Sequence, residues 1–136
     1  MRLNAHLFFD GRCEDAFRFY ARCLGGRLLA MLRYRDSPLV GAVPLAWQDK
    51  ILHATLDLGE ARLTGADVSA DEGYRPPEGF SVLLEPSGGA EAEGVFASLS
   101  EGGTVRMPLQ RTFWAERFGM VTDRFGIPWM LQCSTP

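Results

Sequence analysis

The chain has 136 residues, 46% of them hydrophobic and 23% charged, and a formal net charge of −3 at pH 7. This length and composition fit one globular domain, and without an evident basic face a nucleic-acid partner is not expected. No apolar run approaches the roughly 18 residues of a membrane span, and the N-terminal segment lacks the apolar stretch of a signal peptide. We therefore expect a cytoplasmic protein with no membrane partner, whose three cysteines stay reduced.

The first half of the chain reads as a strand, a helix and three further strands. The helix carries two acids in its first turn and ends before a pair of glycines, Gly25-Gly26. Its apolar face, at helical spacing, consists of Cys13, Ala16, Phe17, Tyr20 and Leu24. In chain order we expect a strand over 3–11, the helix over 13–24, a strand over 27–35, a connection broken by Pro and Gly over 36–49, and a hairpin formed by 50–58 and 61–67.

The second half follows the same order, and a weak internal repeat supports the correspondence. A shift of 77 residues lays Phe19 on Phe96 and places a Gly pair after each helix. The predicted elements are a strand over 79–86, a helix over 89–103 with Ala92, Val95, Phe96 and Leu99 on one face, and strands over 104–110, 118–123 and 127–133. Because neither half is large enough to close a core alone, we expect a single domain made of module one, 1–68, and module two, 69–136, joined at a seam over 69–79.

Strand alternation predicts an α+β fold in which two βαβββ modules form one curved, mixed, mostly antiparallel sheet. In the first strand an apolar face of Leu3, Leu7 and Phe9 opposes a mixed face, and two later strands divide in the same way. The mixed faces carry Asn4, His6, Phe8, His53, Thr55, Met130 and Gln132. We expect the helices to cover the outer face of the sheet, so that the mixed faces either meet solvent or line a cavity.

Three stretches resemble the vicinal oxygen chelate superfamily, which comprises glyoxalases, bleomycin-resistance proteins and ring-cleaving dioxygenases. They are FFDGRCEDAFRFYARCLGGRL at 8–28, ILHATLDLGEARLTGAD at 51–67 and TFWAERFGMVTDRFGIPWML at 112–131. The last stretch is the most specific, and it is similar to the PhnB-like branch. The resemblance covers nearly the whole chain. It implies paired βαβββ modules, a cavity inside a curved sheet, and a homodimer.

The resemblance also implies a divalent metal held by His or Gln and Glu side chains from four strands, with open positions for substrate oxygens. The candidate ligands here are His6 and His53, to which Glu116 could be added. Met130 stands where the resemblance implies a glutamate, and methionine is a poor ligand for a hard cation. The other two expected positions hold Thr64 and either Gly79 or Phe80. We therefore expect neither the standard metal nor another cofactor, and a divalent ion at His6, His53 and Glu116 is the alternative.

Motifs of other chemistries are not found in the sequence. There is no GxSxG, no P-loop, no GxGxxG after a strand, and no glycine-rich unit for S-adenosylmethionine. The leading hypothesis is a PhnB-like protein of unassigned activity that binds a small molecule in the sheet cavity; whether it is catalytic stays open. The alternatives are a metal-dependent lyase or dioxygenase, and a drug-sequestering protein like the bleomycin-resistance proteins. The candidate pocket residues are Asn4, His6, Phe8, His53, Thr55, Trp114, Glu116, Phe118, Met130 and Gln132.

The aromatic and charged stretch near the C-terminus is expected to form one wall of this cavity. A strand over 112–122 would place every second side chain on the same face. Those side chains are Thr112, Trp114, Glu116 and Phe118. Trp114 then either continues a flat apolar wall with Phe118 or seals a dimer contact. Residues 123–126 suit a type I turn before the final strand, in which Trp129 is expected to pack under a helix.

The sequence predicts a homodimer, because apolar residues occupy both faces of the strands in a chain of two small modules. We expect sedimentation at micromolar concentration to report a species of twice the 15.1 kDa chain mass. Finding only the 15.1 kDa species would remove this idea.

Overall fold

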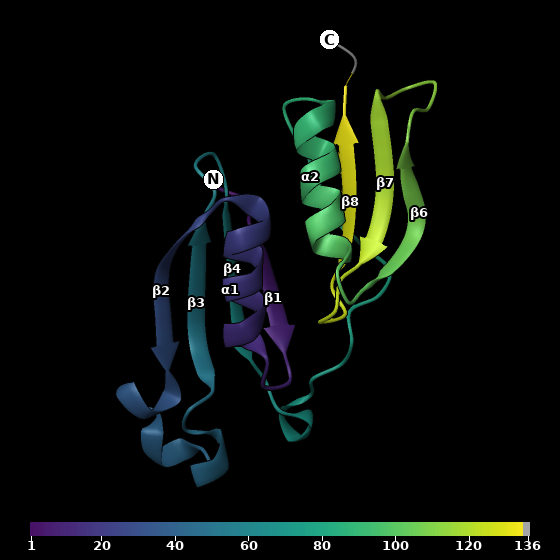
Figure 1. Cartoon of the computed structure of the whole chain (residues 1–136). Coiled ribbons are helices and arrows are strands. Elements are labelled where there is room, and N and C mark those ends of the chain that lie inside the picture. The colour runs from purple at the N-terminus through teal and green to yellow at the C-terminus, as the bar shows by residue number, and fades with distance from the viewer. Residues whose placement is uncertain (135–136) are drawn as a thin grey trace. The chain divides into compact units, whose positions relative to one another are not determined.

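The computed structural model describes residues 1–134. They divide into two compact units, and the chain passes from the first to the second between Arg75 and Pro76. This boundary lies inside the predicted seam over 69–79. Each unit contains one long helix and one four-stranded mixed sheet (Figure 1). The predicted α+β class and the βαβββ order of both halves are confirmed, with the strands hydrogen-bonded as two sheets. No helix within residues 1–134 has the length and apolarity to cross a bilayer.

The first unit has the strand order β1-β4-β3-β2, in which β1 runs parallel to β4 and the other pairs are antiparallel. Its elements are β1 (Ala5–Phe9), α1 (Cys13–Leu24), β2 (Arg27–Arg33), β3 (Ile51–Asp57) and β4 (Arg62–Asp67). Short 3-10 turns η1 (Tyr34–Asp36), η2 (Val40–Ala42) and η3 (Leu45–Trp47) fill the predicted broken connection, and η4 (Ala70–Glu72) follows β4. Helix α1 contacts β2, β3 and β4, and so covers one face of this sheet.

Helix α1 buries most of the face that its sequence predicted. Cys13, Ala16, Phe17 and Tyr20 are buried, whereas Leu24 is only half-buried and Phe19 is buried in addition. The helix ends at Gly25, whose φ of 71° lies in the left-handed region that glycine adopts without a steric penalty. At Gly65 of β4 an added Cβ would lie 2.5 Å from the Phe17 ring, so the absence of a side chain there lets α1 approach the sheet.

One buried carboxylate holds the start of α1. Arg12 at the N-cap position makes no side-chain capping bond. Instead, Asp67 at the end of β4 accepts hydrogen bonds at Oδ1 from the N–H groups of Gly11 and Cys13, each at 2.9 Å. Its Oδ2 accepts a third from the N–H of Ile51, also at 2.9 Å. Asp67 therefore satisfies donors at the beginning of both α1 and β3, which the local sequence leaves without acceptors.

The second unit has the equivalent strand order β5-β8-β7-β6, with β5 parallel to β8. Its elements are β5 (Val82–Leu84), α2 (Gly89–Ser100), β6 (Thr104–Gln110), β7 (Arg117–Thr122) and β8 (Pro128–Cys133). Ala92, Phe96 and Leu99 form the buried face of α2, as predicted, whereas Val95 is half-buried. An added Cβ at Gly119 of β7 would lie 2.9 Å from the Phe96 ring, so α2 also approaches its sheet over a glycine.

The predicted turn before the final strand is confirmed. The N–H of Gly126 donates to the carbonyl of Asp123 at 3.0 Å, and Gly126 has a φ of 90°. Asp123 Oδ1 also accepts from the N–H groups of Phe125 and Ile127 at 2.8 and 3.0 Å. Trp129 is 1% exposed, on the helix side as predicted, and its Nε1 donates to Asp123 Oδ2 at 2.8 Å. This turn therefore sets which side chains of β8 face away from α2.

Several strand boundaries differ from the prediction, and two of the differences move residues that were predicted for the site or the core. The strand predicted over 112–122 begins only at Arg117, because Thr112 and Ala115 bond each other and close a tight loop. The N–H of Thr112 donates to the carbonyl of Ala115, and the N–H of Ala115 donates to Thr112 Oγ1, each at 3.1 Å. At the N-terminus β1 begins at Ala5, and Leu3, predicted for the apolar face, is 97% exposed.

We expect Phe17→Ala to lower the free energy of unfolding by about 3–5 kcal/mol, because Phe17 is fully buried and its loss leaves a cavity beside Gly65. Urea unfolding followed by circular dichroism measures this change. Phe113→Ala is the matched control, since Phe113 is 98% exposed and its loss should cost no more than about 0.5 kcal/mol. A cost below about 1 kcal/mol for Phe17→Ala would mean that the buried face of α1 is assigned wrongly.

Candidate functional site

The face of the first sheet that lies opposite α1, here called its open face, carries two histidines that are each bonded to a threonine. His6 Nδ1 lies 2.7 Å from Thr64 Oγ1. His53 Nε2 lies 3.0 Å from Thr55 Oγ1. The two imidazole rings are stacked, with centroids 6.3 Å apart. The structure thus brings together His6, His53 and Thr55, three residues that strand alternation assigns to one face.

Strand register explains this cluster. The parallel pairing of β1 with β4 sets His6 beside Thr64, and the antiparallel pairing of β3 with β4 sets Thr55 beside the same Thr64. Phe8 lies on the same face, with its ring edge-on to His6 at 5.0 Å between centroids. The pKa of His6 is lowered, first by partial burial and second by the neighbouring His53. The neutral imidazole is therefore favoured, and it offers both a donor and an acceptor.

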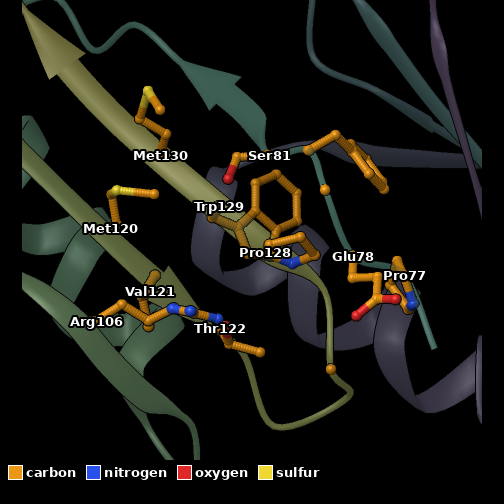
Figure 2. A pocket seen from close by; sticks show the side chains of 13 residues that line it. Pro77, Glu78, Ser81, Arg106, Met120, Val121, Thr122, Pro128, Trp129 and Met130 are labelled. Carbon is orange, nitrogen blue, oxygen red and sulfur yellow. Dashed lines mark hydrogen bonds between the residues drawn. The ribbon is translucent and has the colours of Figure 1, made fainter.

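The open face of the second sheet contains a hollow of about 640 Å³. Its floor comes from β7 and β8, where register pairs Met120 with Met130 and Thr122 with Pro128. The residues that line the hollow are Pro77, Glu78, Gly79, Phe80, Ser81, Arg106, Met120, Val121, Thr122, Gly126, Pro128, Trp129 and Met130. Figure 2 shows both methionines on one side of this hollow, with Arg106 entering beside Thr122 and Glu78 on the far side. The hollow therefore combines apolar side chains with the polar groups of Glu78, Ser81, Arg106 and Thr122.

An aromatic ledge lies at the other end of β7. Phe118 pairs with Gln132 across the strands, and the Trp114 ring lies edge-on to Phe118 at 5.3 Å between centroids. Phe113 lies edge-on to Trp114 in turn, at 4.7 Å. Trp114 is 49% exposed. Although Trp114 comes from a loop rather than the predicted strand, it still contacts Phe118. Phe118 is buried, so the exposed apolar surface here comes from Trp114 and Phe113.

Asn4 and Glu116, two of the predicted pocket residues, lie away from the open faces, and Phe8, beside His6, also lines a separate hollow. Asn4 lies in the exposed segment before β1 and lines a separate hollow of about 480 Å³ beside the β3–β4 turn. Phe8 lines a smaller hollow of about 300 Å³ that also involves Tyr74. Glu116 Oε1 points at the start of α2, where it lies 3.1 Å from the position of a Cβ added to Gly89. The Glu116 carboxylate therefore lies on the helix side of the sheet. The backbone N–H of Glu116 donates to the carbonyl of Cys133 at 2.9 Å.

A sequence model of the Glyoxalase/Bleomycin resistance protein/Dioxygenase superfamily matches residues 2–131. The chain belongs to this superfamily. Protein YjdN of Escherichia coli (strain K12) is 32% identical over 149 aligned residues, which cover 96% of this chain and 94% of YjdN. This level of identity over nearly both full lengths agrees with the match to the family model.

Two solved structures share the fold of this chain. The crystal structure of protein PA1353 from Pseudomonas aeruginosa is 44% identical, with a TM-score of 0.91 over 100% of this chain and 99% of that one. The PhnB protein from Bacillus cereus is 23% identical, with a TM-score of 0.80 over 98% of this chain and 100% of that one. At this lower identity the likeness to the PhnB protein shows the fold alone. The chain therefore shares its architecture with the PhnB protein.

The superfamily's metal chemistry does not fit the donors present here. Both candidate histidines are engaged by threonine hydroxyls, and the open-face positions of β8 hold Met130 and Gln132. Glu116 points at the start of α2 instead. Among residues 1–134 no group of three or more His, Cys, Asp or Glu side chains is placed to hold an ion. Two imidazoles without a carboxylate are too few for a site that needs three or four donors.

Several residues that the structure places at the sites were not among the predicted pocket residues, including Thr64, Glu78 and Arg106. Thr64 bonds His6, and alternation in the hairpin places Thr64 on a polar face, but only the parallel pairing of β1 and β4 brings it beside His6. Arg106 lines the hollow of the second sheet. Residues 104–110 alternate between polar residues such as Thr104 and Arg106 and apolar residues such as Val105 and Met107. The bulge at Arg106 interrupts the two-residue period, so alternation by itself does not assign the faces of this strand.

The lowered pKa of His6 predicts a loss of stability on acidification. Below the ordinary pKa of about 6.5 the unfolded chain takes up a proton that the folded chain resists, so stability falls as the pH drops through 6.5 and the loss is complete below the folded pKa. We expect His6→Gln to show a smaller fall in urea midpoint between pH 7.5 and pH 5 than the unchanged protein. His53→Gln removes the second cause of the lowered His6 pKa, so it should also reduce the fall in urea midpoint, but by less than His6→Gln does. An unchanged pH profile in both variants would contradict the effect.

Proposed function

We propose that this chain binds a small organic molecule on the open faces of its sheets, and that it does so without the standard superfamily metal. The hollow of about 640 Å³ in the second unit is the observation that supports this proposal. Ligand sites in proteins span about 300–1,000 Å³ and are mostly apolar, with a few polar groups that fix orientation. Met120, Met130 and Pro128 supply the apolar surface, and Ser81 and Arg106 supply polar groups.

Binding rather than metal-assisted chemistry is the function that the donor set supports. A lyase or dioxygenase of this superfamily would need several oxygen or nitrogen ligands around one cation. The second open face instead offers thioethers, which adapt their shape to varied apolar ligands. We propose that the protein works as a cytoplasmic homodimer.

The test is a thermal-shift screen of small carboxylates, amines and aromatic compounds, run with and without Mn²⁺, Ni²⁺ and Zn²⁺. We expect at least one compound to raise the melting temperature equally in the presence and absence of the ions, since ligand binding to the folded state stabilises it. A stabilisation that requires an ion would overturn the metal-free part of the proposal. A screen in which no compound binds would overturn the binding function itself.

We expect Met130→Trp to abolish the response to such a compound, because a larger side chain fills the hollow. Val105→Trp is the matched control. Val105 is exposed on the same sheet, but it pairs with Val121 and lies outside the hollow. Titration calorimetry on both variants measures the effect. Equal binding by both variants would place the ligand outside the hollow.

We expect Trp114→Ala to weaken ligand binding while the dimer persists, if the aromatic ledge forms a wall of the site. Trp114 contacts Phe118 and is half exposed, so its ring is available to a flat ligand. Titration calorimetry and sedimentation of the same sample separate the two roles. Loss of the dimer before loss of binding would show that Trp114 seals an interface instead. Unchanged binding and an unchanged dimer would mean that Trp114 neither forms a wall of the site nor seals an interface.

A further inference from the structure

Arg106 occupies a β-bulge at the edge of the hollow. Val105 and Met107 pair with Val121 and Met120, which are adjacent on β7, so Arg106 is the extra residue on β6. Its Nη1 lies 3.5 Å from Thr122 Oγ1, on the open face. Bulges interrupt the pairing of a strand, redirect a side chain and are frequent beside functional sites. The bulge therefore gives a backbone reason for the presence of a guanidinium at this hollow.

The first unit has the same bulge with a different side chain. Leu28 and Ala30 of β2 pair with Leu56 and Thr55, which are adjacent on β3, so Leu29 is the extra residue there. The repeat shift of 77 residues lays Leu29 on Arg106. Since one copy of the bulge accommodates leucine, the backbone at this position does not need an arginine. The fold therefore does not require the positive charge of Arg106, which lies at the hollow of the second unit.

Glu78 brings the opposite charge to the other side of the same hollow. In the order β5-β8-β7-β6, Arg106 lies on one edge strand and Glu78 lies in the segment that leads into the other. Figure 2 shows the two side chains reaching into the hollow from opposite sides. Within the described part of the chain neither has an ion-pair partner, and the only hydrogen bond between Arg106 and another side chain is the one with Thr122.

These charges restrict what can fill the hollow. Both side chains are exposed in the unbound chain. A molecule that covers the hollow displaces part of the water around both groups, and a charge that loses water is disfavoured unless it gains a partner. A neutral molecule would leave both charges without a partner. An anion would match Arg106 but leave Glu78 alone, and a cation would do the reverse. A zwitterion matches both.

We propose that the hollow selects a short zwitterion with an apolar middle, whose acid end lies at Arg106 and whose ammonium end lies at Glu78. This inference rests on the proposed binding function and names its ligand class. Arg106 reaches β7, so about two strand spacings, or roughly 10 Å, separate its guanidinium from β5, and Glu78 lies in the segment that leads into β5 and lines the same hollow. An extended chain of two or three amino acids spans about 7–10 Å. The apolar middle lies over Met120 and Met130.

The probe is the tripeptide Ala-Leu-Ala in four forms: unmodified, N-acetylated, C-amidated, and modified at both ends. Titrations are followed through the ¹³C-labelled methyl groups of Met120 and Met130, which report from inside the hollow. We expect the unmodified peptide to bind at least about tenfold more tightly than either singly modified form, as loss of one charged contact implies. The doubly modified form should bind most weakly. Equal affinity of the four forms would overturn the proposal.

Variants assign each charge to one end of the peptide. Arg106→Leu restores the residue found at the equivalent bulge of the first unit, so the fold should tolerate it. This variant should bind the unmodified and amidated peptides equally. Glu78→Gln should bind the unmodified and acetylated peptides equally. The matched controls Arg111→Leu and Glu85→Gln change the same charges on exposed residues outside the hollow, and both should retain the zwitterion preference. Retention of that preference in Arg106→Leu and Glu78→Gln would overturn the assignment.

The methyl signals of Met120 and Met130 distinguish a wrong ligand class from a wrong binding function. If compounds from the thermal-shift screen shift the Met120 and Met130 methyl signals but none of the four peptides does, the hollow binds ligands and the zwitterion assignment is wrong. If neither the screened compounds nor the peptides shift them, the binding function of the hollow is wrong as well. An Arg106–Glu78 ion pair that closes over a neutral ligand would appear as tightest binding of the doubly modified peptide, and this also overturns the zwitterion assignment.

Discussion

The first unit depends on one carboxylate that is buried among backbone N–H groups. The N–H groups at the start of a helix have no partner within it, and Arg12 does not cap α1. Asp67 arrives from the far end of β4 and accepts three N–H bonds, which fixes where α1 and β3 begin. Burial raises its pKa more than those bonds and the nearby Lys50 lower it. An unpaired buried N–H costs about 1–3 kcal/mol, so several elements rely on this one side chain.

The second unit uses a buried carboxylate for a different purpose. Asp123 accepts two backbone N–H bonds within its own turn and one from the Trp129 indole. Because Trp129 is held on the helix side, its neighbour Met130 faces the other way, onto the open face. The turn thus determines the orientation of the whole final strand. The repeated βαβββ order is therefore stabilised by unrelated contacts in its two copies.

One backbone plan supports two chemically different open faces. The first presents neutral imidazole and hydroxyl groups around His6, whereas the second presents thioethers bounded by Arg106 and Glu78. Strand pairing uses backbone groups, so open-face side chains can differ between the modules without disturbing register. Such freedom explains how one fold accommodates several activities, and why the site rather than the fold must carry a functional argument. It also explains why bulges at Leu29 and Arg106 coexist with such different side chains.

The sequence by itself determined the elements and most of their faces. Helical spacing, strand alternation and glycine stops are local signals, and they predicted both helices and the burial of Trp129. Only the tertiary structure decided the partners. The contact of Thr64 with His6 requires a parallel pairing between distant strands, and the position of Arg106 requires a bulge that no local pattern marks. The loop that ends before Arg117 was missed because it depends on hydrogen bonds that compete with strand pairing, a balance that side-chain periodicity does not record.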